Sequence, residues 1–129
     1  MPSKILIVED NVTNQKVISW LLESMDIKCD VVACGEAVLP ALEKNQYHLI
    51  FMDLRLPGMD GNATTEQIRK AGFTLPIIAT SANDFYDSNA GCIEAGMDGY
   101  LMKPFTRGDL EGMLSRFRPA PSETEEKPL

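Results

Sequence analysis

Three acids, a serine and a lysine of this 129-residue chain stand close behind short apolar runs: Glu9, Asp10, Asp53, Ser81 and Lys103. Carboxylates that crowd together raise one another's pKa unless a cation lies between them. An oxygen-rich site with open positions suits Mg²⁺, or Mn²⁺ in its place. A lysine and a hydroxyl beside it could bind the oxygens of a phosphoryl group. If the fold brings these side chains together, they predict phosphoryl transfer to a carboxylate.

The apolar runs are typical of strands in a parallel sheet that is covered on both faces. They span residues 5–8, 29–33, 49–52, 77–79 and 100–102. Segments of helical periodicity alternate with them: a first one with Val17, Ile18, Leu21, Leu22 and Met25 on one stripe, then 36–44, 63–71, 84–95 and 106–117. This alternation predicts a three-layer, doubly wound α/β fold with a five-stranded parallel sheet. We assign it to the flavodoxin-like class and take the strand order 2-1-3-4-5 from that class. Ligands of such sheets bind beyond the C-terminal strand ends, where the polar residues fall.

Two segments depart from this pattern. Pro40 falls inside the second helical segment, where it removes a backbone donor, so that helix is expected to start late or kink. Residues 118–129 contain three prolines and no core residues, and we expect a disordered acidic tail or a linker there. The folded domain is therefore expected to span residues 1–117.

Charge and cysteine content argue against several classes of protein. A formal net charge of −7 and a pI near 4.6 disfavour binding to nucleic acid and docking on anionic membranes. No apolar run approaches the roughly 20 residues of a transmembrane helix. Cys29, Cys34 and Cys92 lack the spacing of a zinc site or a disulfide framework. We expect a cytoplasmic protein with reduced thiols.

The chain resembles a response-regulator receiver domain, of the CheY-like kind, over about residues 3–117. Four motifs carry the resemblance in the family's order and spacing: Ile5-Leu-Ile-Val-Glu9-Asp10-Asn11, Phe51-Met-Asp53-Leu-Arg55-Leu-Pro57-Gly-Met-Asp-Gly61, Pro76-Ile-Ile-Ala-Thr80-Ser81-Ala82 and Gly99-Tyr100-Leu-Met-Lys103-Pro104-Phe105. The first motif, followed by Asn14 and Gln15, is most similar to receivers of hybrid sensor histidine kinases.

The resemblance implies that Asp53 is the phosphoacceptor, in a domain that catalyses its own phosphorylation and dephosphorylation. Glu9 and Asp10 would bind Mg²⁺ together with Asp53 and the backbone carbonyl of Arg55. Such a module would switch conformation or relay the phosphate; whether it is excised from a hybrid kinase or stands alone remains open.

The resemblance also implies roles for the remaining motif residues. Ser81 would contact the phosphoryl group, with the preceding Thr80 as the competing hydroxyl. Lys103 would pair with a phosphoryl oxygen, and its bond to Pro104 is expected to be cis. Tyr100 would be the aromatic switch, with simple packing as the alternative.

The expected partner is a histidine kinase or a histidine phosphotransfer protein. The domain itself is expected to be a monomer. The donor histidine must reach Asp53 over the edge where the first helix begins. Docking is therefore expected at Asn11, Asn14, Gln15, Pro104 and Phe105.

Two other functions compete with this interpretation. A degenerate receiver would bind partners without phosphorylation, but the complete set of acids, hydroxyl and lysine argues against it. A flavodoxin-like cofactor binder would need a Gly/Ser/Thr-rich phosphate loop after the first strand, where acids stand instead. The single histidine, His48, is expected at the surface and is not interpreted as a phosphorylated residue.

Overall fold

Five parallel strands form one sheet in the computed structural model, which describes residues 4–81, 94–103 and 105–117. The strands are β1 (Lys4–Val8), β2 (Lys28–Val32), β3 (Leu49–Asp53), β4 (Ile77–Ser81) and β5 (Gly99–Met102). Their order across the sheet is β2-β1-β3-β4-β5, and every neighbouring pair is parallel. The predicted doubly wound order is confirmed, and the C-terminal ends of β1 and β3 lie side by side.

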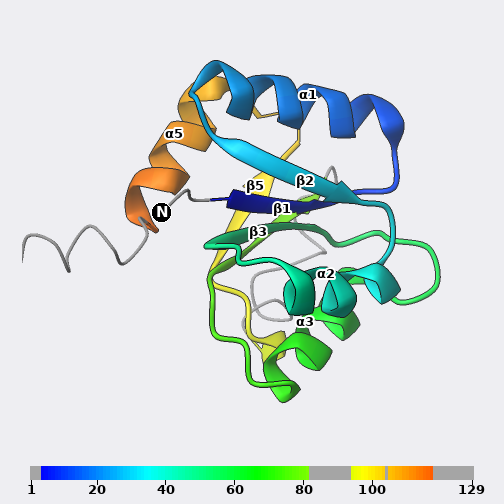
Figure 1. Ribbon diagram of the computed structural model, residues 1–129. Coiled ribbons are helices and arrows are strands. Elements are labelled where there is room, and N and C mark those ends of the chain that lie inside the picture. The colour runs from blue at the N-terminus through cyan, green and yellow to red at the C-terminus, as the bar shows by residue number, and fades with distance from the viewer. Residues whose placement is uncertain (1–3, 82–93, 104, 118–129) are drawn as a thin grey trace, which may run out of the picture.

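Helices cover both faces of this sheet (Figure 1). They are α1 (Val12–Ser24), α2 (Val38–Lys44), α3 (Gly61–Lys70) and α5 (Arg107–Arg116), with a 3₁₀ turn at Gly35–Ala37 ahead of α2. Helices α1 and α5 lie on one face, and α2 and α3 lie on the other. Asn11, Asp60 and Thr106 cap the starts of α1, α3 and α5 by accepting the backbone N–H three residues further on.

The sheet separates two hydrophobic clusters. Ile7 and Phe51 pack toward α1 and α5 with Leu110, whereas Leu6 and Ile50 belong to the cluster on the α2 and α3 side. Neighbouring residues such as Leu6 and Ile7 are both fully buried because successive side chains of a strand point to opposite faces. Each such side chain stabilises the fold by about 1.5–3 kcal/mol. This burial on both sides explains the consecutive apolar positions of the strands.

Several expectations can be compared with this fold. Helix α2 begins at Val38, so Pro40 lies in its first turn, where no intrahelical N–H bond is lost; the expected late start is confirmed. Val17 does not join the buried stripe: it is 42% exposed, because it lies about 100° around the helix from Ile18. His48, expected at the surface, is only partly exposed, and burial lowers its pKa.

Other expectations fall outside the described residues. These are the Lys103–Pro104 bond, the tail at 118–129 and the helix expected at 84–95, of which only residues 94 and 95 are described. Within the described ranges, no helix has both the length and the hydropathy to cross a bilayer.

Arg69 joins α3 to the loops that precede β4 and β5, at the N-terminal ends of the strands. Its guanidinium donates to the carbonyl oxygens of Phe73, Leu75 and Gly96 and to the carboxylate of Asp98, at distances of 2.8–3.0 Å. The same Asp98 oxygen accepts the N–H of Ile77, at the start of β4. A Cβ on Gly96 would stand 2.9 Å from the Arg69 side chain, and its φ of +109° also favours glycine. The planar guanidinium, with its several fixed donors, thus joins α3 to the N-terminal ends of β4 and β5.

Replacing Arg69 by alanine is expected to lower the free energy of unfolding by about 2–3 kcal/mol, because several part-buried acceptors lose a charged donor. Arg69→Lys should recover only a fraction, since an ammonium cannot reach acceptors on three sides. Urea denaturation monitored by circular dichroism measures both values. The control is Arg107→Ala, whose exposed pair with Glu111 (3.1 Å) should contribute less than about 0.5 kcal/mol. Similar losses of stability for Arg69→Ala and Arg107→Ala would contradict this stabilising role of Arg69.

Candidate functional site

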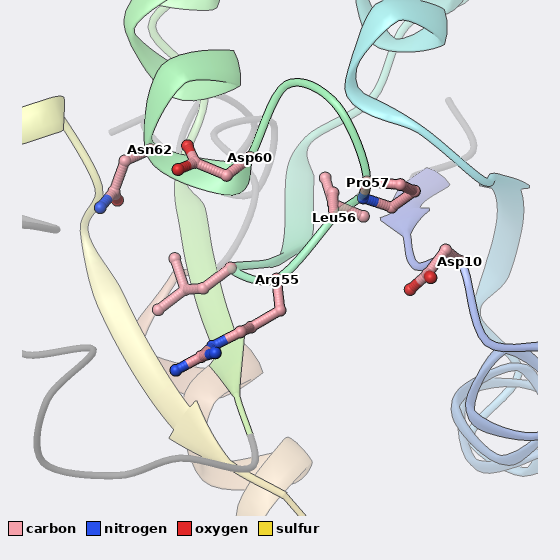
Figure 2. Close-up of a pocket in the computed structure, with 7 residues that line it drawn as sticks. Asp10, Arg55, Leu56, Pro57, Asp60 and Asn62 are labelled. Carbon is pink, nitrogen blue, oxygen red and sulfur yellow. The ribbon is translucent and has the colours of Figure 1, made fainter.

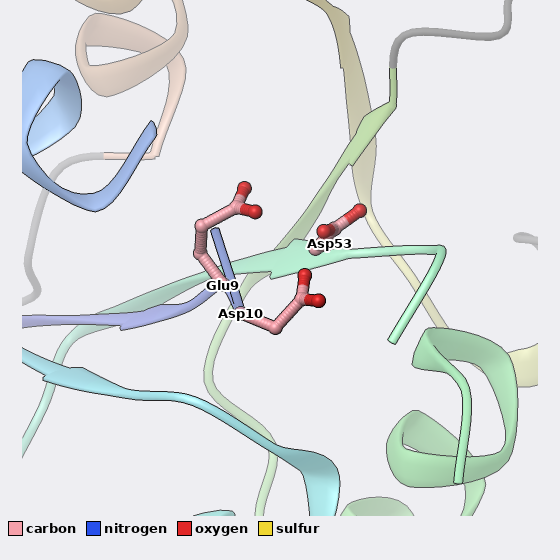
Figure 3. Close-up of side chains that lie close together, drawn as sticks. All are labelled: Glu9, Asp10 and Asp53. Atoms are coloured by element: carbon pink, nitrogen blue, oxygen red, sulfur yellow. The ribbon is translucent and has the colours of Figure 1, made fainter. Parts of the chain in front are cut away.

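Three carboxylates gather at the C-terminal ends of β1 and β3. Glu9 and Asp10 follow β1 directly, and Asp53 is the last residue of β3. One oxygen from each lies within 4.8 Å of the others, and Figure 3 shows the three side chains converging from the two strand ends. The parallel pairing of Val8 with Met52 places both strand ends at the same level. The predicted convergence of these acids is therefore what the structure shows.

Lys103 supplies the positive charge among these acids. Its Nζ lies 2.6 Å from Oε1 of Glu9 and 3.5 Å from Oδ2 of Asp53. Its backbone N–H donates to the carbonyl oxygen of Ser81 at 2.8 Å, which anchors the end of β5 to the end of β4. In this structure the ammonium is therefore closer to Glu9 than to Asp53.

The pKa of the buried Asp53 carboxyl is raised by some neighbours and lowered by others. Asp53 is only 4% exposed, and burial raises its pKa to about 6. The negative charge of Glu9 also raises the pKa, whereas the Arg55 N–H, which donates to Oδ1 at 3.0 Å, and the Lys103 charge lower it. A buried carboxylate that one neighbouring lysine only partly compensates can be stabilised further by a cation.

The loop after β3 passes close to the first turn of α3. A Cβ on Gly61 would lie 2.5 Å from the carbonyl oxygen of Asp53, so only glycine allows this approach. The Gly61 N–H donates to the carbonyl oxygen of Leu54 at 3.2 Å, and Asp60 caps α3 through the Ala63 N–H. Gly61 belongs to the second sequence motif, but its role in this close approach to the Asp53 backbone was not predicted.

An open cleft of about 520 Å³ borders the acidic cluster. It is lined by Asp10, Leu54, Arg55, Leu56, Pro57, Asp60 and Asn62. Figure 2 shows Asp10 at one end and Asn62 at the other, with Arg55 between them. The cleft gives a ligand of moderate size access to the side of the cluster where Asp10 stands.

The start of α1 wraps around Glu9. Its Oε2 accepts the Asn11 N–H at 3.2 Å and lies 3.5 Å from Nδ2 of Asn14. Gln15 donates from Nε2 to the backbone carbonyl oxygen of Glu9 at 2.7 Å. Asn14 and Gln15 were expected to dock the partner, and their inward contacts were not predicted. The signal was available in their spacing, because both stand within the first turn after the capping Asn11.

The remaining predicted residues are placed as follows. Ser81 is fully buried at the end of β4, and Thr80, also buried, pairs with Asp53 in the sheet. Tyr100 is partly buried and packs against the α2 and α3 side. Phe105 is 9% exposed and belongs to the opposite cluster, so its ring packs in the core and offers little surface to a partner. Pro104 lies outside the described residues.

The donor set of the cluster fits a hard divalent cation. Carboxylate oxygens are the ligands that Mg²⁺ and Mn²⁺ prefer, and Mg²⁺ is usually bound by few protein oxygens plus water. Glu9 and Asp53 are buried, whereas Asp10 is exposed, which leaves an open side for further ligands.

The raised pKa of Asp53 predicts a pH-dependent stability for the metal-free protein. Its pKa is about 6 when folded and about 4 when unfolded, so the folded state binds more protons between these values. The associated stability is complete below about pH 4 and is lost as pH rises through about 6. Asp53→Asn escapes this loss and should be more stable than wild type at pH 8, by on the order of 1–3 kcal/mol.

Urea denaturation in chelator from pH 4 to pH 8 measures this difference, which should shrink toward pH 4. Asp60→Asn is the matched control, because asparagine caps a helix as well as aspartate does. If wild type and Asp53→Asn followed parallel pH profiles, the electrostatic account of Asp53 would be wrong.

Comparison with known proteins identifies relatives of this fold and site. The family model of the response regulator receiver domain matches residues 5–115. The osmosensing histidine protein kinase SLN1 of Saccharomyces cerevisiae is 38% identical over 121 residues, covering 88% of this chain and 10% of that protein. The sensor histidine kinase RcsC of Escherichia coli is 36% identical over 113 residues, covering 88% of this chain and 12% of that protein. The chain thus spans only about a tenth of the length of these curated relatives.

A solved structure agrees with this relationship. The receiver domain of the sensor histidine kinase PA1611 of Pseudomonas aeruginosa has a TM-score of 0.83 and 40% identity, covering 91% of this chain and 98% of that one. That crystal structure has a magnesium ion coordinated in its active-site cleft. Sequence, topology and site geometry agree: the chain belongs to the response regulator receiver domains of two-component signalling.

Proposed function

We propose that this receiver domain accepts a phosphoryl group on Asp53, that a bound Mg²⁺ or Mn²⁺ is required, and that the donor is a phosphohistidine on a partner protein. The observation that carries the proposal is the gathering of Glu9 and Asp10 around Asp53, with Lys103 3.5 Å from the acceptor carboxylate. The magnesium in the cleft of the related PA1611 receiver supports the assignment of the cation.

In the proposed reaction, an Asp53 carboxylate oxygen forms a bond to phosphorus as the bond between phosphorus and the donor imidazole nitrogen breaks. The electron pair of the broken bond stays on that nitrogen, which later takes up a proton. Glu9, Asp10, Asp53 and the Arg55 carbonyl would hold the cation, which when bound neutralises charge on the phosphoryl oxygens. Lys103 is close enough to Asp53 to add a second positive charge to the same oxygens.

Two further residues complete the proposal. Ser81, at the C-terminal end of β4, would donate its hydroxyl to a phosphoryl oxygen. Tyr100, on the neighbouring strand β5, would change its packing in response, so that the domain acts as a switch or a relay. The complete set of acids, hydroxyl and lysine disfavours the degenerate alternative.

Phosphorylation by a small donor tests the acceptor and the cation together. Acetyl phosphate with Mg²⁺ should add one phosphoryl group to the wild-type domain, as measured by intact mass. Asp53→Asn and excess chelator should each abolish labelling, because one removes the nucleophile and the other removes the charge compensation. Asp60→Asn, an acid on the same cleft but outside the cluster, should be labelled normally.

Three results would contradict this proposal. Labelling of Asp53→Asn would move the acceptor to another residue. Full labelling in chelator would exclude the cation. Absence of labelling in the wild-type domain would favour a receiver that binds partners without phosphate.

The relatives of the chain support a proposal for the wider context of the domain. We propose that it acts in the cytoplasm as a monomer, either as the receiver of a hybrid sensor kinase or as a separate regulator, with a histidine kinase or histidine phosphotransfer protein as partner. The kinases among its relatives support the first form. The net charge of −7 disfavours direct contact with nucleic acid.

The partner is proposed to dock on α1, beside the acceptor site. Asn14 and Gln15, which are expected to contact the partner, are partly engaged with Glu9, and we propose that the exposed apolar residues of this helix add to the contact surface. Val12, Val17 and Trp20 are its exposed large apolar residues, with 61%, 42% and 66% of their surface accessible. Tryptophan is enriched among the residues that contribute most to protein–protein binding, so Trp20 is the principal contact that we propose.

Truncating Val12 and Trp20 together to alanine should slow phosphotransfer from a phosphorylated histidine phosphotransfer protein by about tenfold or more, because large apolar contacts are lost. Labelling by acetyl phosphate should stay at the wild-type rate, since neither side chain belongs to the acidic cluster. Val31→Ala, an exposed apolar residue of the edge strand β2, is the control. Equal slowing with both donors would show damage to the site and contradict docking on this face.

A further inference from the structure

Gln15 makes a contact that the proposed reaction does not use. Its Nε2 donates to the backbone carbonyl oxygen of Glu9 at 2.7 Å, the shortest of the contacts between α1 and Glu9 that the structure describes. That carbonyl belongs to the peptide bond joining Glu9 to Asp10, the two acids that follow β1. A single side chain therefore holds the backbone between two of the three members of the cluster.

This peptide bond governs where both acids point. The Glu9 N–H, which belongs to the preceding peptide, donates to the carbonyl oxygen of Val32, and the Glu9 carbonyl oxygen accepts from Gln15, so the peptides on both sides of the Glu9 Cα are held. The Asp10 side chain is exposed, and its direction therefore depends mainly on its own backbone. Rotation about the Glu9 Cα–C bond would break the hydrogen bond from Gln15 and would move Asp10 and its carboxylate relative to Asp53.

Gln15 is itself held in place by α1. Its backbone N–H donates to the carbonyl oxygen of Asn11 at 2.9 Å, within the first turn of the helix. The Asn11 side chain caps the same turn by accepting the Asn14 N–H. The Gln15 amide thus contacts Glu9 from a capped, hydrogen-bonded helical turn and not from a loop.

We propose that Gln15 is a positioning residue of the cation site: its amide holds the Glu9–Asp10 peptide so that both carboxylates face Asp53. This inference rests on the cation site of the proposed function. In this proposal Gln15 does not contact the cation or the phosphoryl group. It acts on the site only through Glu9 and Asp10.

Cation titration tests this role directly. Gln15→Met keeps the length of the side chain but removes the donor, and Gln15→Ala removes the whole side chain. By isothermal titration calorimetry with Mg²⁺, both variants should bind the cation roughly twofold to tenfold more weakly, the range for loss of one neutral hydrogen bond. Thr13→Ala, an exposed residue of the same turn, should bind as wild type does.

A second measurement separates positioning from a general loss of structure. The rate of acetyl phosphate labelling is followed as a function of Mg²⁺ concentration. In Gln15→Met the Mg²⁺ concentration for half-maximal rate should rise by the same factor as the dissociation constant, while the rate at saturating Mg²⁺ returns to within about twofold of wild type. A defect in folding would lower the saturated rate and leave the dissociation constant of the folded fraction unchanged.

The outcomes distinguish this inference from the proposed function. Unchanged Mg²⁺ affinity in Gln15→Met, or an equal loss in Thr13→Ala, overturns the role of Gln15. A lowered saturated rate with unchanged affinity also overturns it, because the residue would then act on the phosphoryl step or on folding. A wild-type domain that binds Mg²⁺ but is not labelled on Asp53 would overturn the proposed function alone, since the titration would still compare Gln15→Met with wild type.

Discussion

Three carboxylates repel one another at the ends of two neighbouring strands, and the surrounding packing has to hold them together. Glu9, Asp10 and Asp53 bring their oxygens within 4.8 Å of one another, and two of the three residues are buried. Charges of one sign at such distances destabilise the folded state where water is excluded. Lys103 offsets part of this repulsion, through its 2.6 Å contact with Glu9. Burial, and to a smaller extent the charge of Glu9, still raise the pKa of Asp53.

The fold keeps this unfavourable cluster together by rigid packing around it. Every residue of β3 and β4 is buried, so the strand that carries Asp53 cannot move without disrupting the core. Gly61 brings the start of α3 against the Asp53 backbone, and the Lys103 N–H joins the ends of β4 and β5. At the opposite edge, the Arg69 guanidinium joins α3 to the loops near β4 and β5. The stability that the site costs is therefore supplied by apolar burial and backbone contacts elsewhere.

Helix α1 connects this site to the surface. Its first turn contacts Glu9 through Asn11, Asn14 and Gln15, and its opposite face exposes Val12 and Trp20. One short helix therefore borders the acidic cluster on one side and offers an apolar surface on the other. In a receiver domain, this arrangement would place a docked protein beside the acceptor carboxylate.

The fold class and the members of the acidic cluster could be predicted from the sequence, and the strand order was taken from that fold class. Continuous apolar runs identify strands buried on both faces, and in parallel sheets the residues after such runs meet at one edge. Which polar side chains point inward could not be predicted and depends on tertiary packing. Asn14 and Gln15 were assigned to a surface, yet the direction in which α1 leaves β1 turns them toward Glu9. Likewise Phe105 packs in the core, and Lys103 pairs with Glu9, 94 positions away in the chain. Such contacts depend on helix orientation and on long-range packing, which local sequence patterns do not encode.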